Sequence, residues 1–537
     1  MYYLLFILFT IFGNASVLYK VKECDARQVG SVDLEFIRQC FEINEARGFL
    51  YMIKTMGDTQ HLPAMLSEFS AELSQKISNL ETSREKNQIY VRILRMLNNL
   101  HEQDPLIRFS ILDHLLLEQL LSIAINWRQA LYTSSFNTLL DRVLLLVRDG
   151  GVSLHAELIA RTVENRAVFF EALSAYNRLA EVLKNMTEAQ VSELILSDLV
   201  YLQKAHSIRN AIAWMEYLLN PKVSSEIKKV LQQQIAEMAD EQEISPSLMA
   251  LYPQGSVVAN PKTTSNALVA LMCQTYRLMV GATLSESCLQ IESRYKDNIS
   301  VKLDDFLDLR TLVGKDSVNV QRHVFYNDLD GRSTYHFFRK RHELLNHWQI
   351  ETLPTFEIFQ STDQTTGITI QMISNLPQFH SQGSIDIETY NLSEAHEPSV
   401  FVFRGHSYHV VDSLKYLNPN TMLAIVGSCG GFENLETILQ QSPNTQIILT
   451  KGTGTAWINN LIVPAINQRI LSGVQEIHWV EFKQNLRTEL VQSMQRFPNS
   501  DQILNVFDSF YLFPHENIGF IMMRAWMQFL GDNGVKH

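Results

Sequence analysis

The chain has 537 residues, 46% of them hydrophobic, and a formal net charge of −12. This length exceeds what one compact core supports, so we expect at least two domains. The negative balance, without a run of basic residues, argues against a nucleic-acid partner, because phosphate binding needs a concentrated basic surface.

The N-terminal segment MYYLLFILFTIFGNASVLYK begins with an apolar block from Tyr2 to Phe12. This block is too short to span a bilayer as a helix, and small residues follow it at Gly13-Asn14-Ala15. We therefore predict that residues 1–16 are a secretory signal peptide. The protein would then be exported, to the periplasm, the cell surface or the medium, and would not span the membrane after cleavage. The alternative is a buried N-terminal strand or helix.

Export would allow four of the five cysteines to form local disulfides, Cys24 with Cys40 and Cys273 with Cys288. This pairing leaves Cys429 as the odd thiol. Buried free thiols on helices explain the same four cysteines equally well, so both interpretations stay open.

Residues 31–245 contain successive segments with apolar residues at steps of three and four, which is the period of amphipathic helices. Polar, Gly-containing or Pro-containing joints such as RDGG and NPKVSS separate several of them. We predict an all-α domain over residues 17–315, either a bundle or an irregular helical array, whose Leu, Phe and Met stripes form its core. The sequence identifies no protein partner for this domain.

The pattern changes near Val318, where segments typical of strands begin to alternate with helical segments. The clearest predicted strands lie in VNVQRHVF, SVFVFRGHS, TMLAIVGS and TQIILTKGTGT. Such alternation is typical of a mainly parallel sheet covered by helices. We therefore predict an α/β domain over residues 316–537.

Two successive predicted strands end on reactive residues, His406 in FVFRGHS and Cys429 in VGSCGG. In an open parallel sheet such residues gather at the carboxyl ends of the strands, and a right-handed crossover makes the two strands neighbours or near neighbours. The imidazole and the start of the next helix both favour the thiolate of Cys429. We expect Cys429 to act as nucleophile, His406 as general base and acid, and the N–H groups of Cys429 and Gly430 as oxyanion donors.

A strand ending in His, followed by a strand ending in a small-residue Cys-Gly cluster, resembles the caspase-like cysteine peptidase fold of caspases, legumains, gingipains, clostripain and separase. In that superfamily the His precedes the Cys, as His406 precedes Cys429. The usual signature is His-Gly, with the glycine N–H binding the oxyanion, whereas here Ser407 follows the His. The resemblance covers about residues 318–537. It implies hydrolysis of a peptide or protein substrate through an acyl-enzyme, without a cofactor.

The resemblance also implies that substrate peptide lies across the strand ends. The segment KGTGTA, which begins at Lys451, ends the next strand on the same edge. Gly452 and Thr453 would line the pocket for the residue before the scissile bond, where Lys451 would favour an acidic side chain. Asp328 and Asp330, in YNDLDG, would orient His406 or select a basic residue, unless they only satisfy the amides of a turn.

Two other chemistries fit the same segments. Gly427–Gly431 matches G-x-C-x-G, the elbow of glutamine-amidotransferase-like and some hydrolase folds, and FPHENIGF supplies His515 and Glu516 downstream of the nucleophile. YNDLDG resembles the D-x-D-G motif of haloacid-dehalogenase-like phosphatases, with Asp328 as nucleophile and Asp330 as acid. That fold needs a later acidic pair for magnesium, which the sequence does not offer.

A non-catalytic interpretation also stays open. Glycine-flanked cysteines at strand ends are often buried and inert, so Cys429 is explained by packing as well as by catalysis. A lapsed peptidase fold joined to a long helical domain would then serve as an interaction scaffold. His406 and His409 form H-x-x-H, but no third ligand lies near them in the sequence, so we predict no metal site.

Overall fold

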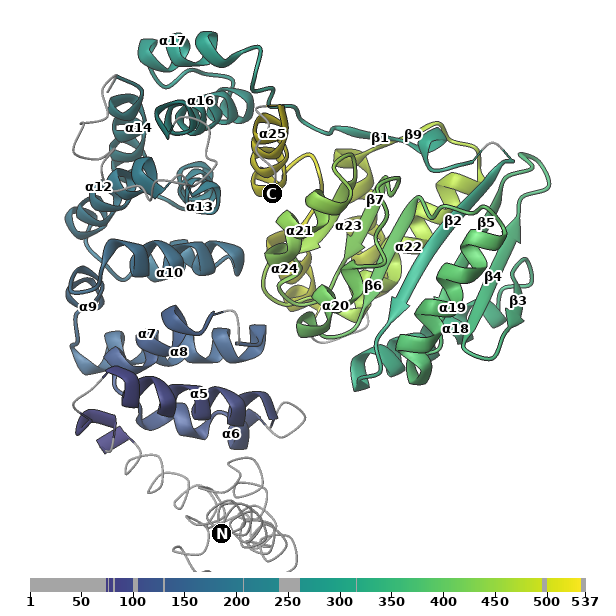
Figure 1. The fold of residues 1–537 in the computed structure, drawn as a ribbon, viewed down its shortest axis with the longest axis horizontal. Helices are drawn as coiled ribbons and strands as arrows, with labels where there is room; N and C mark the ends of the chain where they lie inside the picture. Colours follow the sequence, from purple (N-terminus) through teal and green to yellow (C-terminus); the bar gives the residue numbers. More distant parts are fainter. Residues whose placement is uncertain are drawn as a thin grey trace, which may run out of the picture. The chain divides into compact units, whose positions relative to one another are not determined.

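A computed structural model describes residues 74–75, 77–80, 83–99, 105–128, 131–205, 207–240, 261–314, 316–494 and 500–532. The predicted signal peptide and the Cys24–Cys40 pair lie outside these residues. The chain forms two compact units, residues 1–157 and 158–537 (Figure 1). The boundary predicted at 315/316 falls inside the second unit. No helix in the described ranges is long and apolar enough to cross a membrane.

The described residues of the first unit form helices and the turns that connect them. Its helices are α5 (Ser83–Asn99), α6 (Pro105–Arg108), α7 (Leu117–Asn126), α8 (Thr133–Gly150) and the first part of α9 (Leu154–Ile159). Arg108 connects three of them, because its Nε donates to the Leu97 carbonyl at 2.7 Å and its Nη2 to the Ser135 hydroxyl at 2.9 Å. Leu120 and Phe136 are fully buried, as expected of apolar stripes at helical spacing.

The second unit begins with a set of helices that we call the helical layer. Its members are α10 (Val163–Ala175), α11 (Leu179–Leu183), α12 (Glu188–Ala205), α13 (Ile208–Leu219), α14 (Ser225–Asp240), α16 (Pro261–Val280) and α17 (Glu286–Tyr295). The C-terminal helix α25 (Ile518–Asp532) packs against α13 and α16 and so completes the layer. The pattern of apolar residues did not predict that the end of the chain would return to these helices.

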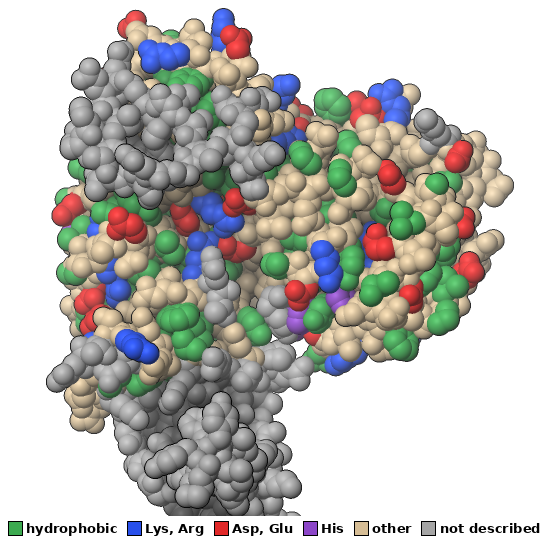
Figure 2. All heavy atoms as spheres, in the orientation of Figure 1, with side chains coloured by type: hydrophobic (Ala, Val, Ile, Leu, Met, Phe, Trp, Pro, Cys, Tyr) green, Lys and Arg blue, Asp and Glu red, His purple; other side chains and the backbone are tan. Residues whose placement is uncertain are grey.

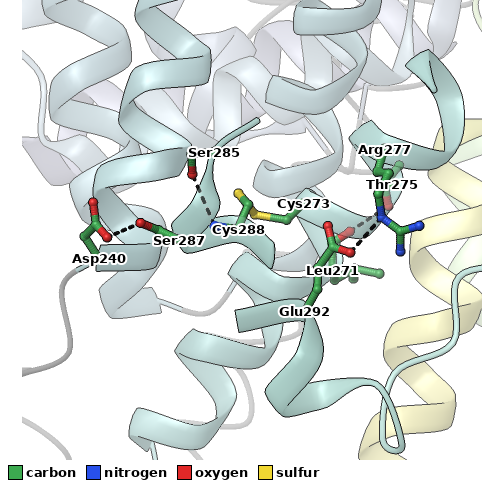
Figure 3. Close-up of a disulfide and its surroundings, with 9 residues drawn as sticks. All are labelled: Asp240, Leu271, Cys273, Thr275, Arg277, Ser285, Ser287, Cys288 and Glu292. Carbon is green, nitrogen blue, oxygen red and sulfur yellow. Dashed lines mark hydrogen bonds and ion pairs between the residues drawn. A yellow bond between two sulfur atoms is a disulfide. The ribbon is translucent and has the colours of Figure 1, made fainter. Parts of the chain in front are cut away.

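A disulfide joins α16 to α17 through Cys273 and Cys288, whose Cα atoms are 5.6 Å apart (Figure 3). This confirms one of the two pairs considered from the sequence. The Ser285 hydroxyl caps α17 by accepting the Cys288 N–H at 3.2 Å. Arg277 of α16 also lies 2.8 Å from Glu292 of α17, so the disulfide and this ion pair both join the two helices.

The remainder of the second unit contains an eight-stranded sheet with strand order β10-β8-β7-β6-β2-β5-β4-β3. The strands are β2 (Val318–Phe325), β3 (Gln349–Thr352), β4 (Phe356–Thr362), β5 (Thr369–Asn375), β6 (Val400–Arg404), β7 (Leu423–Val426), β8 (Gln446–Thr450) and β10 (Tyr511–Leu512). The five strands from β8 to β5 run parallel, whereas β10, β4 and β3 are each antiparallel to a neighbour. The predicted mainly parallel sheet is confirmed.

Helices cover both faces of this sheet, and a small antiparallel pair of strands lies beside it. The helices are α18 (Leu329–Glu343), α19 (His380–Ser393), α20 (Val410–Leu414), α21 (Leu435–Gln441), α22 (Ala456–Leu471), α23 (Trp479–Met494) and α24 (Ser500–Phe510); the pair is β1 (Phe306–Asp308) with β9 (Glu476–His478). Val402 and Ile425 pack with α22 and α23 on one face, and Ile373 packs with α19 on the other. Burial on both faces explains the continuous apolar runs of the central strands.

Candidate active site at the carboxyl edge of the sheet

The two predicted catalytic residues follow neighbouring strands. β6 and β7 pair in parallel, with Phe403 opposite Val426. His406 and Cys429 therefore both follow the carboxyl ends of their strands, at one edge of the sheet. The prediction that these two strands are neighbours is confirmed, and the order of the sheet places β2 beside β6 and β8 beside β7 at the same edge.

The turn after β6, residues 405–409, is called here the imidazole turn, and it is held by the start of α18. Asp328 caps α18 by accepting the Gly331 N–H at 2.6 Å, while its second oxygen accepts the backbone N–H of His406 at 3.1 Å. Asp330 Oδ2 lies 3.6 Å from His406 Nδ1. The imidazole is 36% exposed. Figure 2 shows histidine side chains beside acidic ones on this face of the molecule.

His409, the other histidine of the imidazole turn, stacks on the ring of Tyr326 with 3.3 Å between ring centroids. Burial lowers the pKa of His409 to about 4, although Asp328 and Asp412 act in the opposite direction. His380 lies against the same tyrosine ring, and burial also lowers its pKa to about 4. These two rings are therefore neutral packing groups at neutral pH. Among the described residues, no cluster of three or more His, Cys, Asp or Glu is arranged to hold a metal ion.

The turn after β7, residues 427–431, is called here the thiol turn, and it is bound to the segment that follows β8. The Gly430 N–H donates to the Gly452 carbonyl at 2.7 Å. The Thr450 hydroxyl donates to the Ser428 carbonyl, so a second bond fixes the same two segments. An oxyanion could use the Gly430 N–H only if its bond to Gly452 opened.

The glycines of this region allow the backbone segments to approach closely. A Cβ at Gly427 would lie 1.9 Å from Asn459 Oδ1, and a Cβ at Gly454 would lie 2.1 Å from the Gly427 carbonyl oxygen. Asn459 Nδ2 donates to that same carbonyl at 2.8 Å. Gly427 and Gly454 therefore serve the tight packing of the two segments.

The thiol of Cys429 is partly buried, with its Sγ 3.9 Å from the Gly454 carbonyl oxygen. Burial raises the pKa of this thiol, and the carboxylate of Asp330 raises it further. The prediction of an easily formed thiolate is therefore wrong. The segment after the thiol turn is a 3₁₀ turn, Gly431–Asn434, followed by the seven-residue α21, and so short a run offers little helix dipole against the cost of burying the charge.

Lys451, predicted to line a substrate pocket, is buried in an ion pair with Glu216 of α13. Its Nζ also lies 4.2 Å from the centroid of the Phe432 ring. Burial lowers the pKa of Lys451, against the raising effect of Glu216. The hydroxyl of Ser174 donates to the same carboxylate. Thr453, two residues further on, is exposed.

A second contact joins α13 to the residues that follow the thiol turn. Arg209 lies 2.9 Å from Glu436 and 3.6 Å from Glu433. The helical layer thus contacts the chain directly after Cys429 as well as the chain directly after β8.

His515, the partner that the elbow interpretation requires, does not come after the carboxyl end of a parallel strand. β10 runs antiparallel to β8, with Tyr511 opposite Thr450 and Leu512 opposite Leu449. The chain therefore leaves the edge at Tyr511 and runs toward the opposite one. Burial lowers the pKa of His515, and its charged neighbours are Glu516, Lys483 and Asp305. This register does not favour a Cys429–His515 pair.

Sequence patterns missed three residues that shape the thiol turn: Glu216, Asn459 and Tyr511. The Tyr511 hydroxyl accepts the Thr455 N–H at 2.9 Å and lies 3.1 Å from Asn459 Oδ1. Each of the three lies in an ordinary helical or strand segment, far from Cys429 in the sequence. The only available signal was the density of glycines between residues 427 and 454, which indicates close backbone contact.

No family model, curated protein or solved structure matches the chain.

Proposed function

We propose that the chain is a cysteine peptidase of the caspase-like type, in which Cys429 and His406 form the catalytic dyad. The observation that carries the proposal is the position of both residues after the carboxyl ends of the adjacent parallel strands β6 and β7. Asp330 adds support, because its carboxylate faces the His406 ring and also acts on the Cys429 thiol.

In the proposed reaction the resting thiol is neutral, consistent with the raised pKa of Cys429. His406 removes the thiol proton as Sγ attacks the peptide carbonyl carbon, and the carbonyl becomes a tetrahedral oxyanion. The carbon–nitrogen bond then breaks, the imidazolium protonates the leaving amine, and a thioester remains. Water, deprotonated by His406, attacks the thioester, releases the carboxylic acid product and restores the thiol.

The backbone supplies candidate oxyanion donors in this scheme, as in other acyl-transfer sites. The N–H groups of Ser407 and Cys429 are candidate donors at the two strand ends. Gly430 would contribute only after a rearrangement, since its N–H donates to Gly452. Asp330, 3.6 Å from Nδ1, holds the His406 ring so that Nε2 is the nitrogen that transfers the proton.

The test uses peptidyl acyloxymethyl ketones that carry Asp, Asn, Lys or Arg next to the reactive group. Mass spectrometry of the peptide containing Cys429 measures the labelling rate. At least one ketone should label the wild-type protein about 100-fold faster than His406→Ala, the scale of a lost general base. His409→Ala, which removes the neighbouring imidazole, should keep most of the rate. If no ketone labels Cys429, or if His406→Ala reacts as fast as wild type, the peptidase proposal is wrong.

A second candidate function, a non-catalytic interaction scaffold, is favoured by the bonded state of the thiol turn. The Gly430 N–H is engaged, the thiol pKa is raised, and α13 holds Lys451 through Glu216. A scaffold predicts that Cys429 reacts with iodoacetamide like an ordinary buried thiol, at the same rate with and without His406. The peptidase proposal predicts that His406→Ala slows this reaction near neutral pH.

A further inference from the structure

Two arginine side chains bind one asparagine between the sheet and the helices α18 and α22. Arg404, the last residue of β6, donates from Nη2 to the Asn460 side-chain oxygen at 2.7 Å. Arg341 of α18 donates from Nη1 to the Asn460 backbone carbonyl at 2.8 Å. Both arginines and Asn460 line one cavity of about 30 Å³, which we call the arginine cavity.

The positive charge of this cavity is not balanced by a close carboxylate. In the ranges that the structure describes, neither guanidinium has an Asp or Glu oxygen within 4.0 Å. The carboxylates that act on them from further away are Asp330 for Arg404 and Glu489 for Arg341. Burial lowers the pKa of Arg404 to about 10 and also lowers that of Arg341. Both guanidinium groups are desolvated by burial, and a protein seldom buries such a charge without a counter-charge.

The rest of the cavity wall does not add a competing charge. His323 and His342 lie in the wall, and burial lowers the pKa of His342 to about 4 and that of His323 well below its usual range. Both rings are therefore neutral near pH 7. Phe325 and Phe338 supply an uncharged aromatic surface.

The size of the cavity limits what it can hold. A cavity needs about 10–15 Å³ of such volume to hold one water molecule. The arginine cavity, with about 30 Å³, therefore admits a single small ion with little accompanying water. A large organic anion does not fit.

We propose that the arginine cavity binds one small monovalent anion of about the size of chloride. The anion sits against the guanidinium groups of Arg404 and Arg341 and balances their buried positive charge. It thereby stabilises the joint between β6, α18 and α22. This inference is independent of the peptidase proposal, because it requires no chemistry at Cys429.

Thermal unfolding in matched salts tests the proposal on the whole chain. Sodium gluconate, whose anion is too large for the cavity, is replaced by sodium chloride up to about 100 mM at constant ionic strength, so that general screening is unchanged. An anion that binds only the folded state raises its stability by mass action, and we expect Tm to rise by about 2 °C or more. The linewidth of the chloride NMR signal gives a second readout, because bound chloride relaxes faster.

Arg341→Gln and Arg404→Gln should each remove most of the chloride-dependent rise in Tm and of the excess linewidth. Arg332→Gln is the matched control, since this exposed arginine lies on the same helix, α18, and contacts Asn327 rather than the cavity. Equal Tm in the two salts for the wild-type protein overturns the proposal, even if a variant fails to fold. A chloride effect that survives in Arg341→Gln overturns it as well.

Discussion

The imidazole turn and the thiol turn follow adjacent strands, yet the protein holds them in different ways. The imidazole turn is bound by two carboxylates of α18, and the His406 ring remains 36% exposed. The thiol turn is bound by backbone contacts to the segment after β8, and Gly427 and Gly431 leave no space for a Cβ. Access to the site therefore depends on the thiol turn, because the imidazole already lies at the surface.

The helical layer increases this difference. Its helix α13 contacts Lys451 through Glu216 and the chain after Cys429 through Arg209. A movement of α13 would therefore change the surroundings of the thiol more directly than those of the imidazole. In the peptidase proposal, this contact makes the helical layer a support for the nucleophile.

The largest expected effect comes from Lys451→Met, which leaves the carboxylate of Glu216 without its buried partner. We expect the free energy of unfolding to fall by about 3–5 kcal/mol, as when one member of a buried ion pair is removed. Urea unfolding measures the loss, and iodoacetamide should alkylate Cys429 faster once the segment after β8 is released.

The double variant Lys451→Met/Glu216→Gln should recover much of that stability, because it no longer buries an unpaired charge. Arg310→Gln provides a surface comparison, since the Arg310–Asp308 pair is solvent-exposed and should contribute only about 0–1 kcal/mol. A loss in Lys451→Met no larger than in Arg310→Gln would show that α13 does not support the thiol turn.

Gly454→Ala should produce the next largest effect, because its Cβ would meet the Gly427 carbonyl at 2.1 Å. Backbone must shift to admit it, and overpacking of this kind costs about 1–3 kcal/mol. Gly531→Ala is the matched control, because a Cβ there meets nothing within 4 Å. Because Gly531 lies in helix α25, the free energy of unfolding of Gly531→Ala should be unchanged or higher by up to about 1 kcal/mol. Equal stabilities of the two variants would contradict the close packing of the thiol turn.

Acid should destabilise the surroundings of the imidazole turn, with an effect that is spread over several pH units. His380 and His409 have pKa values lowered to about 4 by burial, whereas an unfolded histidine titrates near 6.5. The unfolded state therefore binds more protons between these values. This part of the stability is fully present above about pH 6.5 and is lost as the pH falls toward 4, with a slope of up to about 1.4 kcal/mol per pH unit for each ring.

His380→Gln should remove about one proton from that difference and flatten the dependence of unfolding free energy on pH below 6.5. The effect of His380→Gln on the free energy of unfolding should be constant above about pH 7, because the wild-type histidine and the variant glutamine are both neutral there. A slope that remains unchanged in His380→Gln would mean that other groups cause the acid sensitivity.

The architecture of the sheet followed from local patterns. Continuous apolar runs such as FVF at 401–403 and LAIV at 423–426 are typical of strands buried on both faces, and the structure pairs them in parallel. The neighbouring positions of β6 and β7 were predicted from one short crossover. The Cys273–Cys288 disulfide was one of two open interpretations, because spacing does not distinguish a bridge from two buried thiols.

The electrostatic state of the site did not follow from local patterns. The imidazole of His406 and the expected helix start after Cys429 suggested a thiolate. The raised pKa of Cys429 depends on the burial of its turn against residues 450–454, which are about 20–25 positions away. The roles of Lys451 and of the arginine cavity depend on contacts with α13 and α22 that no local motif records.

The sequence alone determined which segments become helices and strands, and hence that an imidazole and a thiol follow two neighbouring strands, because hydrophobic periodicity and short crossovers act over a few residues. Only the tertiary structure decided how each side chain is solvated and which partner it meets. Desolvation and charge pairing depend on distances between segments remote in the chain, and these distances arise only when the layers pack.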